Sequence, residues 1–214
     1  MVQLALDYAD IEQALKMAEL GVEAGVDILE AGTPLIVSQG VQAIGRLARA
    51  FPQYPILADY KTMDSGGRNV HITKQQGGHY MTVCANAADE TVQAAIHAKK
   101  EVAGVQVVVD TIGVKDQAGR ARLCEQWGAD MVYLHYAADQ WRKDPSQDST
   151  QWLEAVMAAV KIPVGVGTFG VKDAVLAVQG GARLVCVGHP LIDENPLDAL
   201  KEYVQQVKAN YKAA

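Results

Sequence analysis

Several features are scarce or absent in this 214-residue chain, and each absence excludes a class of protein. The three cysteines, Cys84, Cys124 and Cys186, are isolated, and no CxxC spacing occurs. Neither a disulfide framework nor a cysteine zinc site is therefore indicated, and we expect three small hydrophobic side chains in or near the core. No apolar run is long enough to span a bilayer, and Met1 is not followed by a basic and then apolar leader. We expect a cytoplasmic protein.

Clusters of basic residues and flexible linkers are also missing. The formal net charge is −6, and lysine and arginine are not concentrated in any patch, so we do not expect a nucleic-acid partner. No Pro/Gly/Ser-rich linker or low-complexity segment divides the chain. Because 50% of the residues are hydrophobic, the sequence predicts one well-filled domain covering residues 1–214.

Short apolar runs alternate eight times with stretches of helical periodicity. The predicted strands cover residues 2–6, 26–29, 55–58, 80–84, 105–109, 131–134, 162–166 and 184–187. Helices are predicted between them, the first capped by Asp10, whereas residues 31–34 and 136–150 are interpreted as irregular. Eight such units predict an α/β fold, the (β/α)8 TIM barrel. The alternative is a doubly wound open sheet, which usually has a glycine-rich fingerprint where this chain has Asp7-Tyr8-Ala9-Asp10.

Charged or titratable side chains follow five of the predicted strands. They are Asp7, Glu30, Asp59 with Lys61 and Asp64, Asp110, and His135. The active site of such a barrel lies at the carboxyl ends of its strands, so these side chains are expected at one rim. Helix capping is the alternative role for Asp7 or Asp110 taken alone, but Glu30 precedes what we interpret as a loop.

The segment Asp59-Tyr60-Lys61-Thr62-Met63-Asp64 alternates anion, cation and anion. Asp59 and Lys61 are two residues apart, so on an extended backbone they point to the same side. A solvated surface salt bridge is one interpretation. The other is a catalytic array, in which Glu30 and Asp59 bind Mg²⁺ (or Mn²⁺) and Lys61 stabilises developing negative charge.

Two histidines follow predicted strands. His135 is the candidate for proton transfer, because an unshifted imidazole titrates near neutrality; a structural histidine is the alternative. His189 follows Gly188 at the end of the last strand, so it is also expected to face the site.

The D-x-K-x-x-D pattern of Asp59, Lys61 and Asp64 resembles the motif of the orotidine 5'-monophosphate decarboxylase suprafamily, and the resemblance covers nearly the whole chain. Glu30 and the residues around it resemble the metal-dependent branch, which contains 3-hexulose-6-phosphate synthase and 3-keto-L-gulonate-6-phosphate decarboxylase. Asp110 and the H-x-x-x-D pattern of His135 and Asp139 resemble the synthase members.

The resemblance implies a lyase of carbohydrate metabolism that acts on a phosphorylated ketose through an enediolate. The implied reaction is the aldol addition of ribulose 5-phosphate to formaldehyde. The alternatives are decarboxylation of 3-keto-L-gulonate 6-phosphate or a related sugar acid phosphate, and a non-catalytic sugar-phosphate-binding relative. The resemblance also implies a homodimer in which Asp64 reaches into the partner's site.

Two loops depart from the family pattern. Where the family has glycines that bind phosphate through backbone N–H groups, this chain has Gly167-Thr168-Phe169 and Gly188-His189. Phe169 replaces a residue that tolerates a positive φ. Arg142, in the unusual segment after the sixth strand, and His189 are therefore further candidates for binding the phosphate, and Asp7 is expected to contact the sugar.

Overall fold

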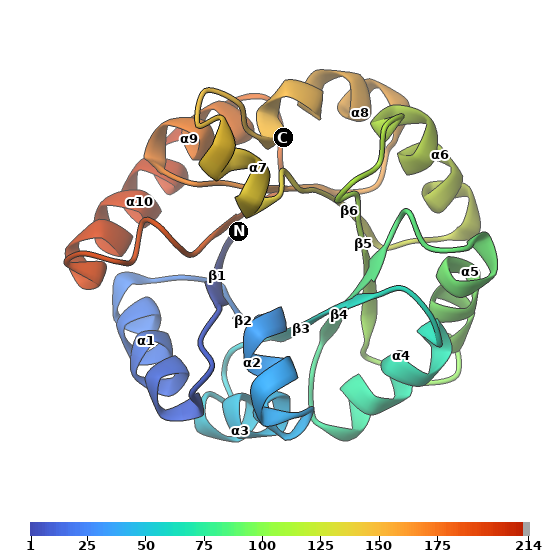
Figure 1. The fold of residues 1–214 in the computed structure, drawn as a ribbon, viewed down its shortest axis with the longest axis horizontal. Helices are drawn as coiled ribbons and strands as arrows, with labels where there is room; N and C mark the ends of the chain where they lie inside the picture. The colour runs from blue at the N-terminus through green and yellow to red at the C-terminus, as the bar shows by residue number, and fades with distance from the viewer. Residues whose placement is uncertain (212–214) are drawn as a thin grey trace.

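Eight parallel strands close into a barrel in the computed structural model, which describes residues 1–211 (Figure 1). The strands are β1 (Val2–Leu6), β2 (Ile28–Ala31), β3 (Ile56–Thr62), β4 (Tyr80–Cys84), β5 (Gln106–Asp110), β6 (Met131–Leu134), β7 (Val164–Gly167) and β8 (Leu184–Val187). Each strand pairs with the next, and β8 pairs with β1, where Val185 lies opposite Val2. The predicted (β/α)8 barrel is confirmed. Residues 212–214 of the predicted domain lie outside the described part of the chain.

Helices surround the barrel and connect its strands (Figure 1). They are α1 (Ile11–Ala24), α2 (Thr33–Gln39), α3 (Gln42–Ala50), α4 (Gly66–Gln75), α5 (Asp89–Ala98), α6 (Gln117–Trp127), α7 (Ala138–Lys143), α8 (Leu153–Ala159), α9 (Val171–Gln179) and α10 (Pro196–Asn210), with a 3₁₀ helix at Ser149–Trp152. Over residues 1–211, a helix with both the length and the apolar character needed to cross a bilayer is not found.

Two apolar layers hold the barrel together. Because side chains alternate along a strand, one set packs outward against the helices and the other points into the barrel. The inner layer consists of Ala5, Ile28, Leu57, Val108, Met131, Leu184 and Cys186. The three cysteines are buried and free, as the sequence predicts. The inner layer forms the floor beneath the polar side chains at the strand ends.

The ends of α1 follow the predicted local chemistry. The Asp10 side chain accepts hydrogen bonds from the N–H groups of Glu12 (2.8 Å) and Gln13 (3.0 Å), which caps the helix. Gly25 ends the helix in the left-handed conformation, with φ at 90°.

The predicted boundaries of β2 and β3 are wrong. β2 extends to Ala31, so Glu30 lies within the strand. β3 extends to Thr62 through an irregularity between Ala58 and Thr62, where Lys61 adopts a φ of 47°. Three of the charged side chains that suggested strand ends, Glu30, Asp59 and Lys61, line the cavity of the barrel, whereas Asp64 is exposed.

The two segments interpreted as irregular both contain helices. Residues 33–39 form α2, and Pro34 stands in its first turn, where proline is well tolerated. Residues 138–143 form α7, which buries none of its side chains. Because α7 has no apolar stripe packed into the core, hydrophobic periodicity could not reveal it.

Candidate active site

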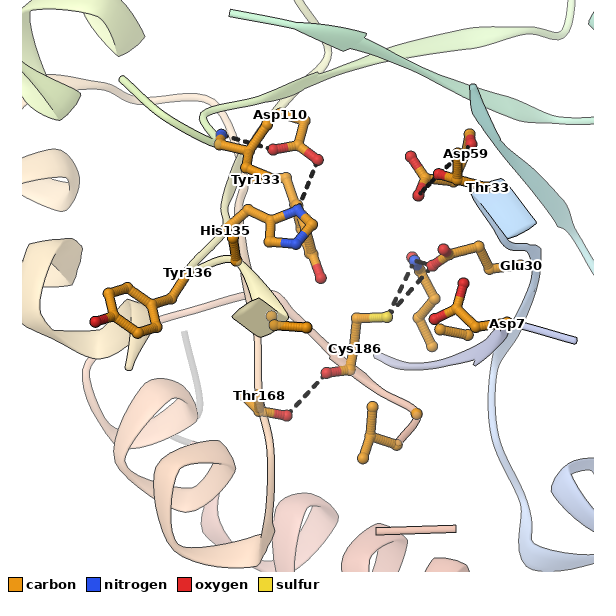
Figure 2. Close-up of a pocket in the computed structure, with 18 of the residues that line it drawn as sticks. Asp7, Glu30, Thr33, Asp59, Asp110, Tyr133, His135, Tyr136, Thr168 and Cys186 are labelled. Atoms are coloured by element: carbon orange, nitrogen blue, oxygen red, sulfur yellow. Dashed lines mark hydrogen bonds and ion pairs between the residues drawn. The ribbon is translucent and has the colours of Figure 1, made fainter. Parts of the chain in front are cut away.

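A cavity of about 600 Å³ opens at the carboxyl ends of the strands. Twelve of the side chains or backbone positions proposed from the sequence line it: Asp7, Glu30, Asp59, Lys61, Asp110, His135, Asp139, Arg142, Gly167, Thr168, Gly188 and His189. Figure 2 shows Asp7, which directly follows β1, Glu30 on β2 and Asp59 on β3 on one side of this cavity, and the Asp110–His135 pair on the other.

Asp59 and Lys61 form an ion pair inside the cavity, with the Asp59 side chain 7% exposed and the Lys61 side chain 30% exposed. Two hydroxyl groups complete the carboxylate's hydrogen bonds. Thr33 donates to Oδ2 of Asp59 (2.8 Å), and Thr82 donates to Oδ1 (2.8 Å). The surface salt bridge that the sequence left open is therefore excluded.

Both members of this pair are held in their charged forms. Burial raises the pKa of Asp59, but the Lys61 charge and the hydrogen bonds outweigh burial, so the pKa lies below its usual value. Burial lowers the pKa of Lys61, but Asp59 and Asp110 outweigh this effect and raise it. Lys61 is thus a permanent cation close to any reacting group.

The Lys61 backbone bulges because β4 holds it there. The Lys61 N–H donates to the Thr82 hydroxyl (3.0 Å), and its ammonium also contacts the Thr33 hydroxyl (3.0 Å). A positive φ is unfavourable for lysine, so these contacts must offset the strain. Thr33 and Thr82 therefore position the Asp59–Lys61 pair.

Glu30 lies beside this pair and is only 6% exposed. Its carboxylate accepts hydrogen bonds from the Gln3 amide and from the Cys186 thiol, whose Sγ lies 3.3 Å from Oε2. Burial, together with the charges of Asp59 and Asp7, raises the pKa of Glu30 to about 8. Burial and the Asp59 charge also raise the pKa of Asp7. This part of the cavity therefore has an excess of negative charge.

His135 is paired with Asp110 across two neighbouring strand ends. Nδ1 of His135 lies 2.8 Å from Oδ2 of Asp110, whose side chain is 1% exposed. Burial lowers the pKa of His135, but the charge and hydrogen bond of Asp110 outweigh burial and raise it above the usual value. The pKa of His135 therefore lies above that of the unshifted imidazole from which the sequence interpretation argued. The pair fixes the ring and leaves Nε2 to exchange a proton.

Comparisons with known proteins show the family to which the chain belongs. The model of the orotidine 5'-phosphate decarboxylase / HUMPS family matches residues 1–203. The chain belongs to this family. It is 36% identical to 3-hexulose-6-phosphate synthase of Mycobacterium gastri, with 94% of this chain and 96% of the relative covered. It is 31% identical to the enzyme of the same name from Bacillus subtilis, with 96% and 84% covered.

A solved structure also resembles this chain over nearly its whole length. The crystal structure of 3-hexulose-6-phosphate synthase from Salmonella typhimurium superposes with a TM-score of 0.91 at 30% identity, covering 98% of this chain and 99% of that one. The family resemblance inferred from the D-x-K-x-x-D motif is therefore confirmed.

Asp64 is the one residue among those predicted for the site that does not line the cavity. It is exposed in the turn after β3, and its Oδ1 accepts a hydrogen bond from the Ser65 N–H (2.6 Å). Any catalytic role for Asp64 must therefore lie outside the cavity of its own barrel.

The negative charges of the Glu30 and Asp59 carboxylates suit the binding of a divalent cation. Glu30 and Asp59 are buried on neighbouring strands, and their mutual repulsion, shared with Asp7, would be relieved by a cation. Within residues 1–211, no three His, Cys, Asp or Glu side chains form a cluster that could hold a metal. Magnesium commonly takes one or two carboxylates and completes its shell with water and substrate oxygens, so these two residues suffice.

The sequence interpretation missed seven polar residues that line the cavity: Gln3, Thr33, Thr82, Tyr133, Tyr136, Cys186 and Asp193. The four that lie on strands, Gln3, Thr82, Tyr133 and Cys186, could have been found from strand periodicity. For example, Gln3 lies four positions before Asp7, and Tyr133 lies two before His135, so each points to the same side as that candidate. Thr33 gave no such signal, since it belongs to the helix that the sequence interpretation took for a loop.

Gly167 and Thr168, which the sequence predicts to contact the phosphate, are largely engaged with other residues of the barrel. The Thr168 N–H donates to the Cys186 carbonyl (2.9 Å), and its hydroxyl lies 2.6 Å from the Tyr203 hydroxyl. Gly167 packs close to Tyr133, because a Cβ at this position would lie 2.7 Å from the Tyr133 hydroxyl. These residues line the cavity but have few free donors.

Proposed function

We propose that this protein is a magnesium-dependent lyase that forms an enediolate from a ketose phosphate, and that its reaction is the aldol addition of D-ribulose 5-phosphate to formaldehyde. The observation that carries this proposal is the pairing of His135 with Asp110 across one cavity from the Asp59–Lys61 pair. A base and a fixed cation on opposite walls suit proton removal beside a carbonyl. The synthase names of relatives at 31% and 36% identity support this choice of electrophile.

His135 would begin the reaction. In its neutral form, Nε2 removes a proton from the carbon beside the substrate carbonyl, which leaves an imidazolium and an enediolate. Asp110 holds the ring and stabilises the imidazolium. Because the pKa of His135 is raised, the neutral form becomes available only at higher pH than for a free imidazole.

Lys61 would stabilise the negative charge that develops on the substrate oxygens. It is already charged and oriented by Asp59 and Thr33, so little reorganisation is needed during the reaction. Glu30 and Asp59 would hold magnesium, which when bound supplies further stabilisation of that charge.

Carbon–carbon bond formation completes the sequence. The enediolate carbon attacks the carbon of formaldehyde, and the carbonyl electrons of formaldehyde move to its oxygen. That oxygen then takes the proton from the His135 imidazolium, which returns the base to its neutral form. The product is D-arabino-hex-3-ulose 6-phosphate, and no other reactant is required.

The test follows formaldehyde in a mixture of the purified protein, D-ribulose 5-phosphate and magnesium. We expect formaldehyde to be consumed, and a chelator to stop its consumption. If formaldehyde stays constant, solvent deuterium entering the pentulose would retain the enediolate chemistry and redirect the search to another electrophile or to a sugar acid phosphate, the substrate class of the decarboxylase alternative. If formaldehyde is not consumed and no deuterium enters the pentulose, the proposal is contradicted. Binding of the sugar phosphate without either reaction would support a non-catalytic relative.

A homodimer with shared sites would explain the position of Asp64. We propose that it completes the cavity of a second copy, because it is exposed beside its own cavity and does not line it. Asp64→Ala and Lys61→Ala proteins should each be inactive, yet a mixture allowed to exchange subunits should recover up to about a quarter of the wild-type activity, since random pairing makes about half the dimers mixed and each mixed dimer has one intact site. No recovery after verified exchange would contradict a shared site.

A further inference from the structure

The backbone donors at the start of α9 are already occupied. In TIM barrels a substrate phosphate is frequently bound by the loops after strands 7 and 8 and a helix N-terminus. Here the Phe169 N–H donates to Oδ2 of Asp173 (2.6 Å), and the Gly170 N–H donates to Oδ1 (2.9 Å). Asp173 is 8% exposed. With the Thr168 N–H on the Cys186 carbonyl, three successive N–H groups of this loop are unavailable to a substrate.

The negative charge of the Asp173 carboxylate would also repel a substrate phosphate bound at this loop. A phosphate at these N–H groups would have to displace a buried carboxylate or lie beside it. Both arrangements are costly, because like charges repel most strongly where water is excluded. An anionic group of the substrate therefore needs another partner at this end of the cavity.

An aromatic pair joins α7 to the same loop. The rings of Trp141 and Phe169 stack with their centroids 4.6 Å apart and their planes 12° apart, and both line the cavity. Phe169, which takes the place of a small residue in the loop, thus fixes α7 over the barrel mouth. This contact keeps the next residue, Arg142, on the cavity wall.

The side chains of Arg142 and His189 line this end of the cavity. Arg142 donates from one terminal nitrogen to Oδ1 of Asp139 (2.8 Å), and Nδ1 of His189 contacts Asp193. Arginine carries five N–H donors in a planar fork, so Arg142 can keep Asp139 and still present donors to a phosphate. His189 has only one ring nitrogen left.

We propose that the Arg142 side chain holds the phosphate of the substrate, in place of the β7 loop amides that Asp173 occupies. This assignment rests on the proposed function, since it names the group that recognises the ketose phosphate. The Trp141–Phe169 stack positions Arg142 for this contact.

Calorimetric titration of D-ribulose 5-phosphate and D-ribulose tests the assignment, in magnesium buffer without formaldehyde so that no condensation occurs. The wild-type protein should bind the phosphorylated sugar more tightly than the free sugar. Arg142→Ala should weaken binding of the phosphorylated sugar about 10- to 100-fold and leave binding of D-ribulose unchanged. Lys143→Ala, which changes an exposed neighbour on α7 outside the cavity lining, should alter neither value.

A second substitution tests the part played by Asp173. In the Arg142→Ala background, Asp173→Asn removes the buried charge and frees one loop N–H, so part of the lost preference for the phosphorylated sugar should return. Circular dichroism would verify that the double variant is folded; if it is not, Asp173→Ser replaces it. No recovery in a folded variant would overturn the role of Asp173.

The outcomes separate the two proposals. If the wild-type protein prefers the phosphorylated sugar but Arg142→Ala does not weaken it, the Arg142 assignment is wrong and the lyase proposal stands. If His189→Ala loses the preference for the phosphorylated sugar and Arg142→Ala keeps it, His189 holds the phosphate and the Arg142 assignment is wrong. A wild-type protein that binds neither sugar would overturn the proposed function together with this assignment.

Discussion

Magnesium is expected to raise the melting temperature of the wild-type protein, and Glu30→Gln is expected to abolish that rise and to lower kcat/KM about 1,000-fold. The substitution preserves the shape of the side chain but removes one of the two carboxylates proposed to hold the ion. The metal-free variant should be at least as stable as the metal-free wild-type protein. Burial and the neighbouring acids already favour a neutral group here, which is why the pKa of Glu30 is raised to about 8.

The matched control is Glu19→Gln, which neutralises an exposed carboxylate on α1 and should retain the full magnesium shift. Melting temperatures would be measured for all three proteins with magnesium and with a chelator. An undiminished magnesium shift in Glu30→Gln would show that Glu30 is not a ligand. A lower melting temperature in chelator would instead mean that the negative charge of Glu30 stabilises the fold.

Asp110→Asn is expected to lower kcat/KM about 100-fold and to move the acidic limb of its pH profile to lower pH. In the wild-type protein the Asp110 charge raises the pKa of His135, so kcat/KM should rise with pH through a value above the usual histidine range. Without that charge, burial alone remains and lowers the pKa. The neutral, basic form of His135 is then available at lower pH, although the ring is held less well.

The pH profile distinguishes this role from a purely structural one. A loss of stability would reduce activity at every pH without moving the limb. Asp198→Asn, an exposed carboxylate on α10, should change neither the rate nor the limb. A limb that stays in place in Asp110→Asn, or moves to higher pH, would mean that His135 is not the base.

The fold could be predicted well because its signals are local. Each strand is a short apolar run, and the first helix carries its own cap at Asp10 and its own terminating glycine at Gly25. Where local signals were weak, the prediction failed. In α2 Leu35 alone is fully buried, and α7 buries no side chain, so neither helix shows the repeated apolar positions from which periodicity is recognised.

The sequence by itself determined the barrel and the rim at which its charged side chains meet, because strands that alternate with helices run parallel and have their carboxyl ends at the same rim. Only the tertiary structure decided how those side chains behave. The raised pKa of His135 requires Asp110, 25 residues away, and the bulge at Lys61 requires a hydroxyl from β4, 21 residues away. Asp173 occupies the loop amides because of how the backbone turns into α9. Such contacts depend on three-dimensional distance and on the exclusion of water, and neither can be read from residue order.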